Sequence, residues 1–227
     1  MGRLGDWYKD EKVKVAAMPK KQAAKYIWDY YKIWIISITA ILALIIYLIV
    51  RFVTRIPDNW LYVVFANTRV EAGTGSPLWK EFEERQGYNL KEKNLVFDDA
   101  CYFDFLQNEA RGNNYFNAFV ALVEAGKLDA ITMEPDSLAA LGQTGRLLDL
   151  NADQFAALRE KYVDRFIYYT PPEGSGYTEP IPVGIDISDS ILVTKYHLYQ
   201  EKCALGVGAA SSNIEAVGDF LEFVLEK

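Results

Sequence analysis

Polar side chains gather where apolar runs of the sequence end. The runs are 61–66 (LYVVFA), 94–99 (NLVFDD), 128–133 (LDAITM) and 183–195 (VGIDISDSILVTK). In an open α/β sheet, ligands bind outside the carboxyl ends of the strands. The candidate ligand-binding residues, in the order of these runs, are Asn67 and Thr68; Asp99, Tyr102 and Asp104; Glu134 and Asp136; and Asp186 and Ser188.

These residue types suit a small neutral solute such as a sugar. Aromatic rings stack on the apolar faces of a sugar, and carboxylates accept hydrogen bonds from its hydroxyl groups. The alternative is structural, because helix N-caps and turns use the same acids, amides and hydroxyls. The residue types alone leave both roles open.

Catalysis, a metal and a cofactor are not indicated. GTGSPLW lacks the Gly-Lys-Ser/Thr ending of a phosphate-binding loop, and EGSGY lacks the lead of a nucleophile elbow. His197 is the single histidine, so neither a triad nor a Cys/His metal cluster can be drawn. Asp98 beside Asp99 would need burial to raise the pKa of one carboxyl for acid–base work. We expect a non-enzymatic protein with no cofactor.

Strand-length runs alternate with helical patterns along residues 56–227. Ser76 is placed to cap a helix that has Pro77 in its first turn and Gly87 at its end. The other helices are expected over 114–127, where Gly126 closes the helix, and over 135–145, 151–166 and 211–226; 183–195 suits one or two strands and 202–210 one strand. This alternation predicts an α/β fold with a parallel or mixed sheet and helices on both faces.

Eighteen uncharged residues, Ile33 to Val50, precede this domain. A helix of that length spans about 27 Å, close to the hydrocarbon thickness of a bilayer. Aromatic residues suited to the headgroup level lie at one end, and two arginines lie at the other. We expect a single transmembrane helix with its flank at 33–55. A buried core helix is less favoured, because it would normally show a polar stripe.

The cations on either side of the run predict its orientation. Five lysines from Lys14 to Lys32 precede the span, whereas only Arg51 and Arg55 follow it closely. Lys and Arg beside a span resist translocation, so residues 1–32 are expected to form a cytoplasmic leader and residues 56–227 an extracytoplasmic domain at the cell membrane. A cleaved signal peptide is the competing interpretation. The long leader and the lack of a small-x-small site favour an uncleaved signal anchor.

The expected exported domain is strongly acidic. Residues 1–32 carry a net charge of +4, Arg51 and Arg55 bring it to +6, and the total of −7 therefore leaves −13 for 56–227. Such a field repels nucleic acid and anionic headgroups, so nucleic acid is not an expected partner. Its two cysteines, Cys101 and Cys203, either form a disulfide or are two separately buried thiols, and we expect the latter.

Three segments resemble extracellular solute-binding proteins with the type 2 periplasmic-binding-protein fold. LDAITMEPDSLAALGQTGRLLDL is similar to their strand, polar loop and helix leading to G-x-L-x-D-L; YTEPIPVGIDISDSILVTK is similar to the crossover into their second lobe; and ALGVGAASSNIEAVGDFLEFVLEK is similar to their return strand and following helix. The resemblance implies one such lobe. The chain departs from the family between Lys195 and Cys203, where it is too short for a second lobe.

Two functions follow as hypotheses. The first is a membrane-anchored solute-binding-like protein that acts beside a transporter. The second is a non-enzymatic scaffold or interaction subunit of a membrane complex, in which the lobe is kept and ligand binding is lost. A one-sided site loses much of the burial that a small ligand normally receives, whereas a partner protein could replace the missing wall.

Overall fold

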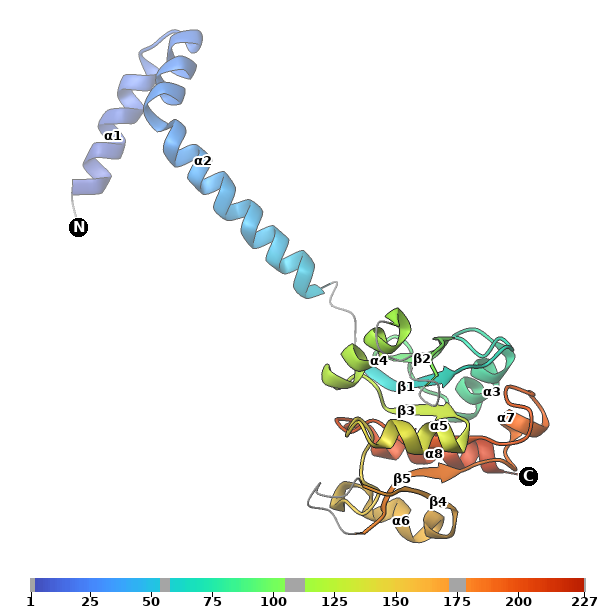
Figure 1. Ribbon diagram of the computed structural model, residues 1–227. Helices are drawn as coiled ribbons and strands as arrows, with labels where there is room; N and C mark the ends of the chain where they lie inside the picture. Colours follow the sequence, from blue (N-terminus) through green and yellow to red (C-terminus); the bar gives the residue numbers. More distant parts are fainter. Residues whose placement is uncertain (1–2, 54–57, 105–112, 172–178, 227) are drawn as a thin grey trace. The chain divides into compact units, whose positions relative to one another are not determined.

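The computed structural model describes residues 3–53, 58–104, 113–171 and 179–226, and the chain divides into two compact units at residues 56 and 57 (Figure 1). The first unit holds α1 (Arg3–Ala16) and α2 (Lys20–Val53). The apolar run 33–50 lies within α2, and residues Lys20–Arg51 are long and apolar enough to cross a membrane. Its large apolar side chains are exposed, as expected for a helix that needs an apolar surrounding.

Helix α1 was not predicted from the basic leader. The turn between the two helices includes Pro19, whose carbonyl oxygen accepts the Gln22 amide at 2.8 Å. The Tyr26 hydroxyl donates to a Glu11 carboxylate oxygen at 3.2 Å and links α2 to α1. The leader is therefore helical in the structure rather than an extended tail.

The second unit is built around one mixed β-sheet (Figure 1). Its strands among the described residues are β1 (Asn59–Ala66), β2 (Asn94–Cys101), β3 (Ala130–Met133), β4 (Phe166–Tyr169), β5 (Ile181–Asp186) and β6 (Ala204–Val207). Their order across the sheet is β2-β1-β3-β6-β5-β4. β1 is parallel to β2 and β3, whereas β6 runs antiparallel to both β3 and β5, and β4 runs antiparallel to β5. The predicted α/β fold with a mixed sheet is confirmed.

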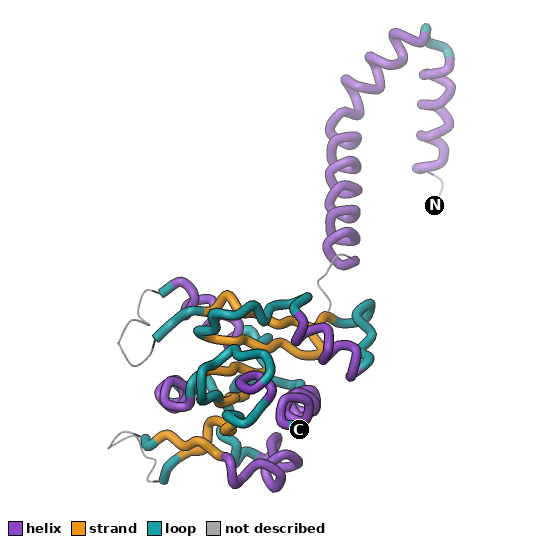
Figure 2. The backbone as a smooth tube through the Cα atoms, turned by 90° about the vertical axis from the view of Figure 1, so that its right-hand side faces the viewer, coloured by secondary structure: helices purple, strands orange, loops and turns teal. Residues whose placement is uncertain are grey.

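Helices cover both faces of this sheet (Figure 2). They are α3 (Pro77–Gln86), α4 (Asn114–Glu124), α5 (Pro135–Gly142), α6 (Ala156–Tyr162), α7 (Ile191–Thr194) and α8 (Ile214–Leu225). Alternating β1 side chains enter two separate cores. Phe65 contacts Phe220 of α8, which in turn contacts Phe82 of α3, whereas Val64 joins the core that contains Phe119 of α4. Because successive side chains of a strand point to opposite faces, β1 contributes side chains to the cores on both faces of the sheet.

The predicted caps of α3 are present. The Ser76 hydroxyl accepts the Trp79 amide at 3.2 Å, and Pro77 begins the helix. Gly87 ends it with φ of 64°, a left-handed conformation that costs glycine little. Gly126 closes α4 in the same way, with φ of 62°.

Two sequence-based boundaries were wrong. The alternation of 183–195 ends with β5, and Ile191–Thr194 form the short helix α7 instead of a second strand. The Asp186 carboxylate accepts the Ser188 amide at 2.8 Å, which turns the chain away from the sheet there. The helix predicted to reach residue 166 ends earlier, because the aromatic and β-branched run from Phe166 forms the edge strand β4.

A buried carboxylate joins β1, β3 and the start of α8. Asp129 is 1% exposed and accepts hydrogen bonds from the Tyr62 amide at 2.8 Å, the Ser211 hydroxyl at 2.7 Å and the Asn213 amide group at 3.2 Å. Burial raises the pKa of Asp129, and the hydrogen bonds from Ser211, Tyr62 and Asn213 act in the opposite sense. A satisfied acceptor of this kind fixes the position of residue 213 relative to the sheet.

Replacing Gly208 by alanine tests how tightly the end of β6 fits. A Cβ atom at residue 208 would lie 2.3 Å from the Leu128 carbonyl oxygen, which is backbone and cannot rotate away. We expect Gly208→Ala to lower the free energy of unfolding by about 1–3 kcal/mol, measured by urea unfolding of the 57–227 unit within the full chain.

Gly218→Ala is the matched control. Its Cβ would meet only the tip of Leu158, at 3.0 Å, and alanine is favoured over glycine inside a helix by about 1 kcal/mol. A Gly208→Ala protein as stable as Gly218→Ala would contradict the close approach of residues 128 and 208.

Candidate functional site

The predicted site residues lie along one edge of the sheet. β1, β2 and β3 are parallel, and β5 shares their direction because β6 is antiparallel to both β3 and β5. The ends of these four strands therefore lie at one carboxyl edge. The nine candidates occupy the last residues of β2 and β5, the loops after the strands and the first turn of α5. The structure brings them to the same edge but divides them into three groups.

The first group joins the loops after β1 and β2. Asn67 adopts a left-handed conformation with φ of 60°, and its amide exchanges two hydrogen bonds with the Phe103 backbone, at 2.9 and 3.0 Å. The buried Thr68 hydroxyl lies 3.1 Å from the Val70 carbonyl oxygen and 3.3 Å from that of Leu198. The Tyr102 hydroxyl donates to the Thr68 carbonyl at 2.8 Å. These polar groups thus bond to the chain itself.

The second group, defined by a shared role and not by contact, consists of Asp99 on β2 and of Asp186 and Ser188 at and after the end of β5. One Asp99 oxygen accepts the amides of Ala72 and Gly73, at 2.8 and 2.9 Å. Asp186 accepts the Ser188 amide, and the Ser188 hydroxyl accepts the Cys203 amide at 3.1 Å. In this structure the three residues act as turn and strand-end anchors, which is the structural alternative that the sequence left open.

The third group consists of Glu134, Asp136 and Asp104, of which the first two are open to solvent. Glu134 and Asp136 are exposed and line a cavity of about 160 Å³ together with residues 200–202. Asp104 is half-buried and is the last described residue before position 113. A cavity of this volume is well below the roughly 300–1,000 Å³ of typical small-molecule pockets.

The centre of the carboxyl edge is filled by the segment between α7 and β6. Tyr199 is 7% exposed, and its hydroxyl lies 2.8 Å from the Thr132 carbonyl oxygen and 3.1 Å from the Ala66 carbonyl oxygen. The Thr132 hydroxyl also lies 2.9 Å from the Tyr199 hydroxyl. Leu198 is also buried, and its amide donates to the Leu192 carbonyl at 2.8 Å. The ends of β1 and β3 are therefore covered by this chain's own residues.

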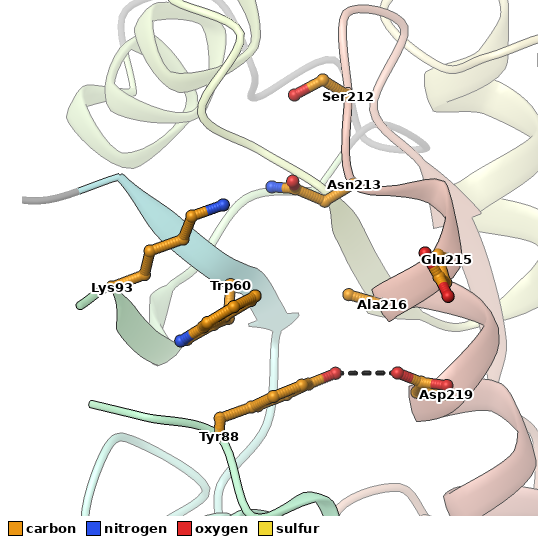
Figure 3. A pocket seen from close by; sticks show the side chains of 8 residues that line it. All are labelled: Trp60, Tyr88, Lys93, Ser212, Asn213, Glu215, Ala216 and Asp219. Atoms are coloured by element: carbon orange, nitrogen blue, oxygen red, sulfur yellow. Dashed lines mark hydrogen bonds between the residues drawn. The ribbon is translucent and has the colours of Figure 1, made fainter. Parts of the chain in front are cut away.

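A larger pocket lies at the opposite, amino edge of the sheet (Figure 3). Its volume is about 340 Å³, and its lining residues are Trp60, Tyr88, Lys93, Ser212, Asn213, Glu215, Ala216 and Asp219. Trp60 comes from the start of β1, and Lys93 directly precedes β2. The acidic residues come from the first turns of α8.

One wall of this pocket is aromatic and carries a cation. The Trp60 and Tyr88 rings stack with centroids 5.3 Å apart and planes 7° from parallel. The Lys93 ammonium lies 4.7 Å from the Trp60 ring centre, and Figure 3 shows it on the side away from Tyr88. The Trp60 indole N–H donates to the Asn89 carbonyl at 3.2 Å, which holds the ring in place.

The facing wall is acidic and belongs to α8. Asp219 accepts a hydrogen bond from the Tyr88 hydroxyl at 2.9 Å, and Glu215 lies one helical turn before it. Burial, followed by the Asp219 hydrogen bond, raises the pKa of Tyr88, so this phenol stays protonated and remains a donor. Asn213 at the end of the pocket is held by Asp129.

The sequence contained only part of the signal for this pocket. The site prediction considered only the carboxyl ends of strands, whereas Trp60 and Lys93 lie at amino ends. The spacing of Glu215 and Asp219 on a predicted helix was a usable clue, because residues four apart share a face. Their closeness to Tyr88, which precedes them by more than a hundred residues, is not visible in sequence.

Neither cysteine is placed for reactivity. Both thiols are free and buried, as expected in preference to a disulfide. Burial raises the pKa of Cys101 to about 12, and burial also raises the pKa of Cys203. Within the described residues, no group of three or more His, Cys, Asp or Glu side chains could hold a metal ion.

Tyr199→Phe tests the filling of the carboxyl edge. The change removes one buried hydroxyl from three polar neighbours without altering the ring, so we expect a loss of about 1–3 kcal/mol in the free energy of unfolding, measured by urea denaturation.

Tyr196→Phe provides the comparison. Its hydroxyl donates to the exposed carboxylate of Glu81, and its removal should cost less than about 1 kcal/mol. Equal, small losses for the two variants would show that Tyr199 is not buried at the strand ends.

Comparisons with known proteins found no relative of this chain. No protein-family model matches the chain, and no curated protein or solved structure matches it either. The likeness to solute-binding proteins therefore rests on the three sequence segments and stays a prediction.

Proposed function

We propose that this protein is a single-pass, membrane-anchored interaction subunit without enzymatic activity. In this proposal α2 crosses the bilayer, residues 1–32 lie in the cytoplasm, and residues 56–227 lie outside, where their sheet domain contacts another membrane protein such as a transporter. The apolar length of α2 and the lysines that precede it support this arrangement.

The observation that carries the proposal is the filled carboxyl edge. Tyr199 and Leu198 occupy the place where a solute would meet the ends of β1 and β3. Six of the nine candidate residues use their side chains to hold loops or strand ends, namely Asn67, Thr68, Asp99, Tyr102, Asp186 and Ser188. Opening this edge for a solute would break the buried hydrogen bonds of Thr68 and Tyr199 and expose the apolar side chain of Leu198, which is costly.

The same edge offers exposed apolar surface for a protein contact. Val70, Tyr102 and Tyr115 are 43%, 44% and 49% exposed. The Tyr102 and Tyr115 rings meet edge to face at 5.8 Å, and the Tyr102 hydroxyl holds the loop that carries Val70. Rigid aromatic rings of this kind are enriched at protein interfaces.

A solute-binding-like protein is the second candidate, and the position of β6 favours it. The segment 204–207, expected as the return strand of a solute-binding lobe, lies between β3 and β5 and is followed by α8. On this alternative the open part of the edge at Glu134 and Asp136 would contact a neutral solute such as a sugar.

The interaction proposal is tested on the full chain in the membranes of its source cells. After crosslinking and mild solubilisation, we expect the chain in a defined assembly with a second protein. Tyr115→Ser should reduce recovery of that partner, because it removes an exposed ring from the edge. Tyr168→Ser is the control, since Tyr168 is also 49% exposed but lies on the edge strand β4. A lone, monodisperse chain, or equal losses with both variants, would contradict the proposal.

The solute alternative predicts a ligand-dependent melting temperature. A ligand that binds only the native state raises stability by about 2.7 kcal/mol at one hundred times its dissociation constant. Sugars and short peptides should therefore raise the melting temperature of the full chain, and Glu134→Gln with Asp136→Asn should abolish the shift. An unchanged melting temperature across the sugars and peptides would remove this alternative.

A further inference from the structure

We propose that the pocket at the amino edge binds a small organic cation with an alkylammonium group. This inference goes beyond the interaction function, which concerns the opposite edge of the sheet. The pocket of about 340 Å³ lies at the lower end of the roughly 300–1,000 Å³ range of small-molecule sites. Its walls supply what an ammonium group requires, an aromatic face and carboxylates.

Lys93 shows that this aromatic face accepts an ammonium group. Its Nζ atom lies 4.7 Å from the Trp60 ring centre, within the distance at which a cation is attracted by the ring quadrupole. Among the residues that the structure describes, no carboxylate forms an ion pair with Lys93. The side chain is long and flexible, so an incoming cation can displace it and take its place on the ring.

The carboxylate-bearing residues of α8 line the side of the pocket opposite this ring, and Asp219 points toward Tyr88 (Figure 3). The Tyr88 hydroxyl holds Asp219 at 2.9 Å, while Glu215 is exposed and has no hydrogen bond or ion pair among the described residues. Two carboxylates against one lysine give the lining a net negative charge. When a ligand displaces Lys93 towards solvent, both carboxylates remain for the ligand.

The charge and shape of the pocket disfavour other ligands. An anion meets two carboxylates and the field of a domain with a net charge of −13. Tyr88 covers one face of Trp60, so a neutral sugar would have to displace Lys93 from the other face without bringing a positive charge to replace its attraction to the ring (Figure 3). A cation is attracted both by the Trp60 ring and by the carboxylates of α8.

Titration calorimetry on the full chain in lipid nanodiscs tests the proposal. The probes are choline chloride and butylammonium chloride, with glucose and sodium acetate as comparisons at equal ionic strength. We expect heat of binding with the two cations only. Glu215→Gln and Asp219→Asn should each weaken binding about fivefold, because each removes one attractive charge.

The effect of Lys93→Met on affinity distinguishes a cation site from an anion site. The substitution removes a competing cation while leaving an apolar stem, so choline and butylammonium should bind about threefold or more tightly. An anion site would instead lose affinity. The control for Glu215→Gln is Glu84→Gln, which removes one negative charge from an exposed position of α3 outside the pocket and should leave the affinity unchanged.

Three outcomes would overturn the proposal: no heat with either cation, binding of acetate or glucose in their place, or weaker cation binding in Lys93→Met. The melting temperature of each variant is measured in parallel. Since Lys93 and Glu215 lie at the surface of the pocket, folded variants are expected.

Discussion

A single buried hydroxyl constrains the carboxyl edge of the sheet. Tyr199 places its phenol oxygen within hydrogen-bond distance of the carbonyls that end β1 and β3. A buried hydroxyl without partners costs about 1–3 kcal/mol, so the segment between α7 and β6 must return over these strand ends. Leu198 and Cys203, on either side of Tyr199, are held as well: the Leu198 amide donates to α7, and the Cys203 amide donates to Ser188, two residues after β5. The short connection between Lys195 and Cys203 therefore covers the ends of β1 and β3.

The two edges of the sheet consequently differ in chemistry. At the carboxyl edge, most polar side chains are satisfied by the chain itself, and the exposed groups are rings and scattered acids. At the amino edge, Asp129 fixes Asn213 and the start of α8, and the first turns of that helix present Glu215 and Asp219 to the Trp60 ring. Exposed rings on an edge whose polar groups are mostly bonded suit a protein contact, whereas a pocket lined by an aromatic wall and carboxylates suits a small charged ligand.

Local patterns predicted the elements well, and their failures have physical reasons. The run LYVVFA gave β1, and Ser76, Pro77 and Gly87 marked both ends of α3, because capping depends on neighbouring residues. The run 183–195 was predicted to hold one or two strands and holds one, because Asp186 turns the chain through a side-chain bond that alternation does not reveal and residues 191–194 form a helix. The candidate residues were correctly assigned to one edge, but Thr68 bonds to Leu198, which is 130 residues away. The Trp60 pocket depends on similarly distant contacts, with Tyr88 reaching Asp219.

Amide hydrogen exchange across the 196–203 segment tests the central claim most directly, namely that this chain closes its own carboxyl edge. The Leu198 amide donates to the Leu192 carbonyl, and the Cys203 amide donates to Ser188. In the full chain these two amides should exchange as slowly as those of β6, because opening them would require exposure of the Tyr199 phenol. Exchange at the rate of an unprotected loop would show that the edge is open and would contradict the account.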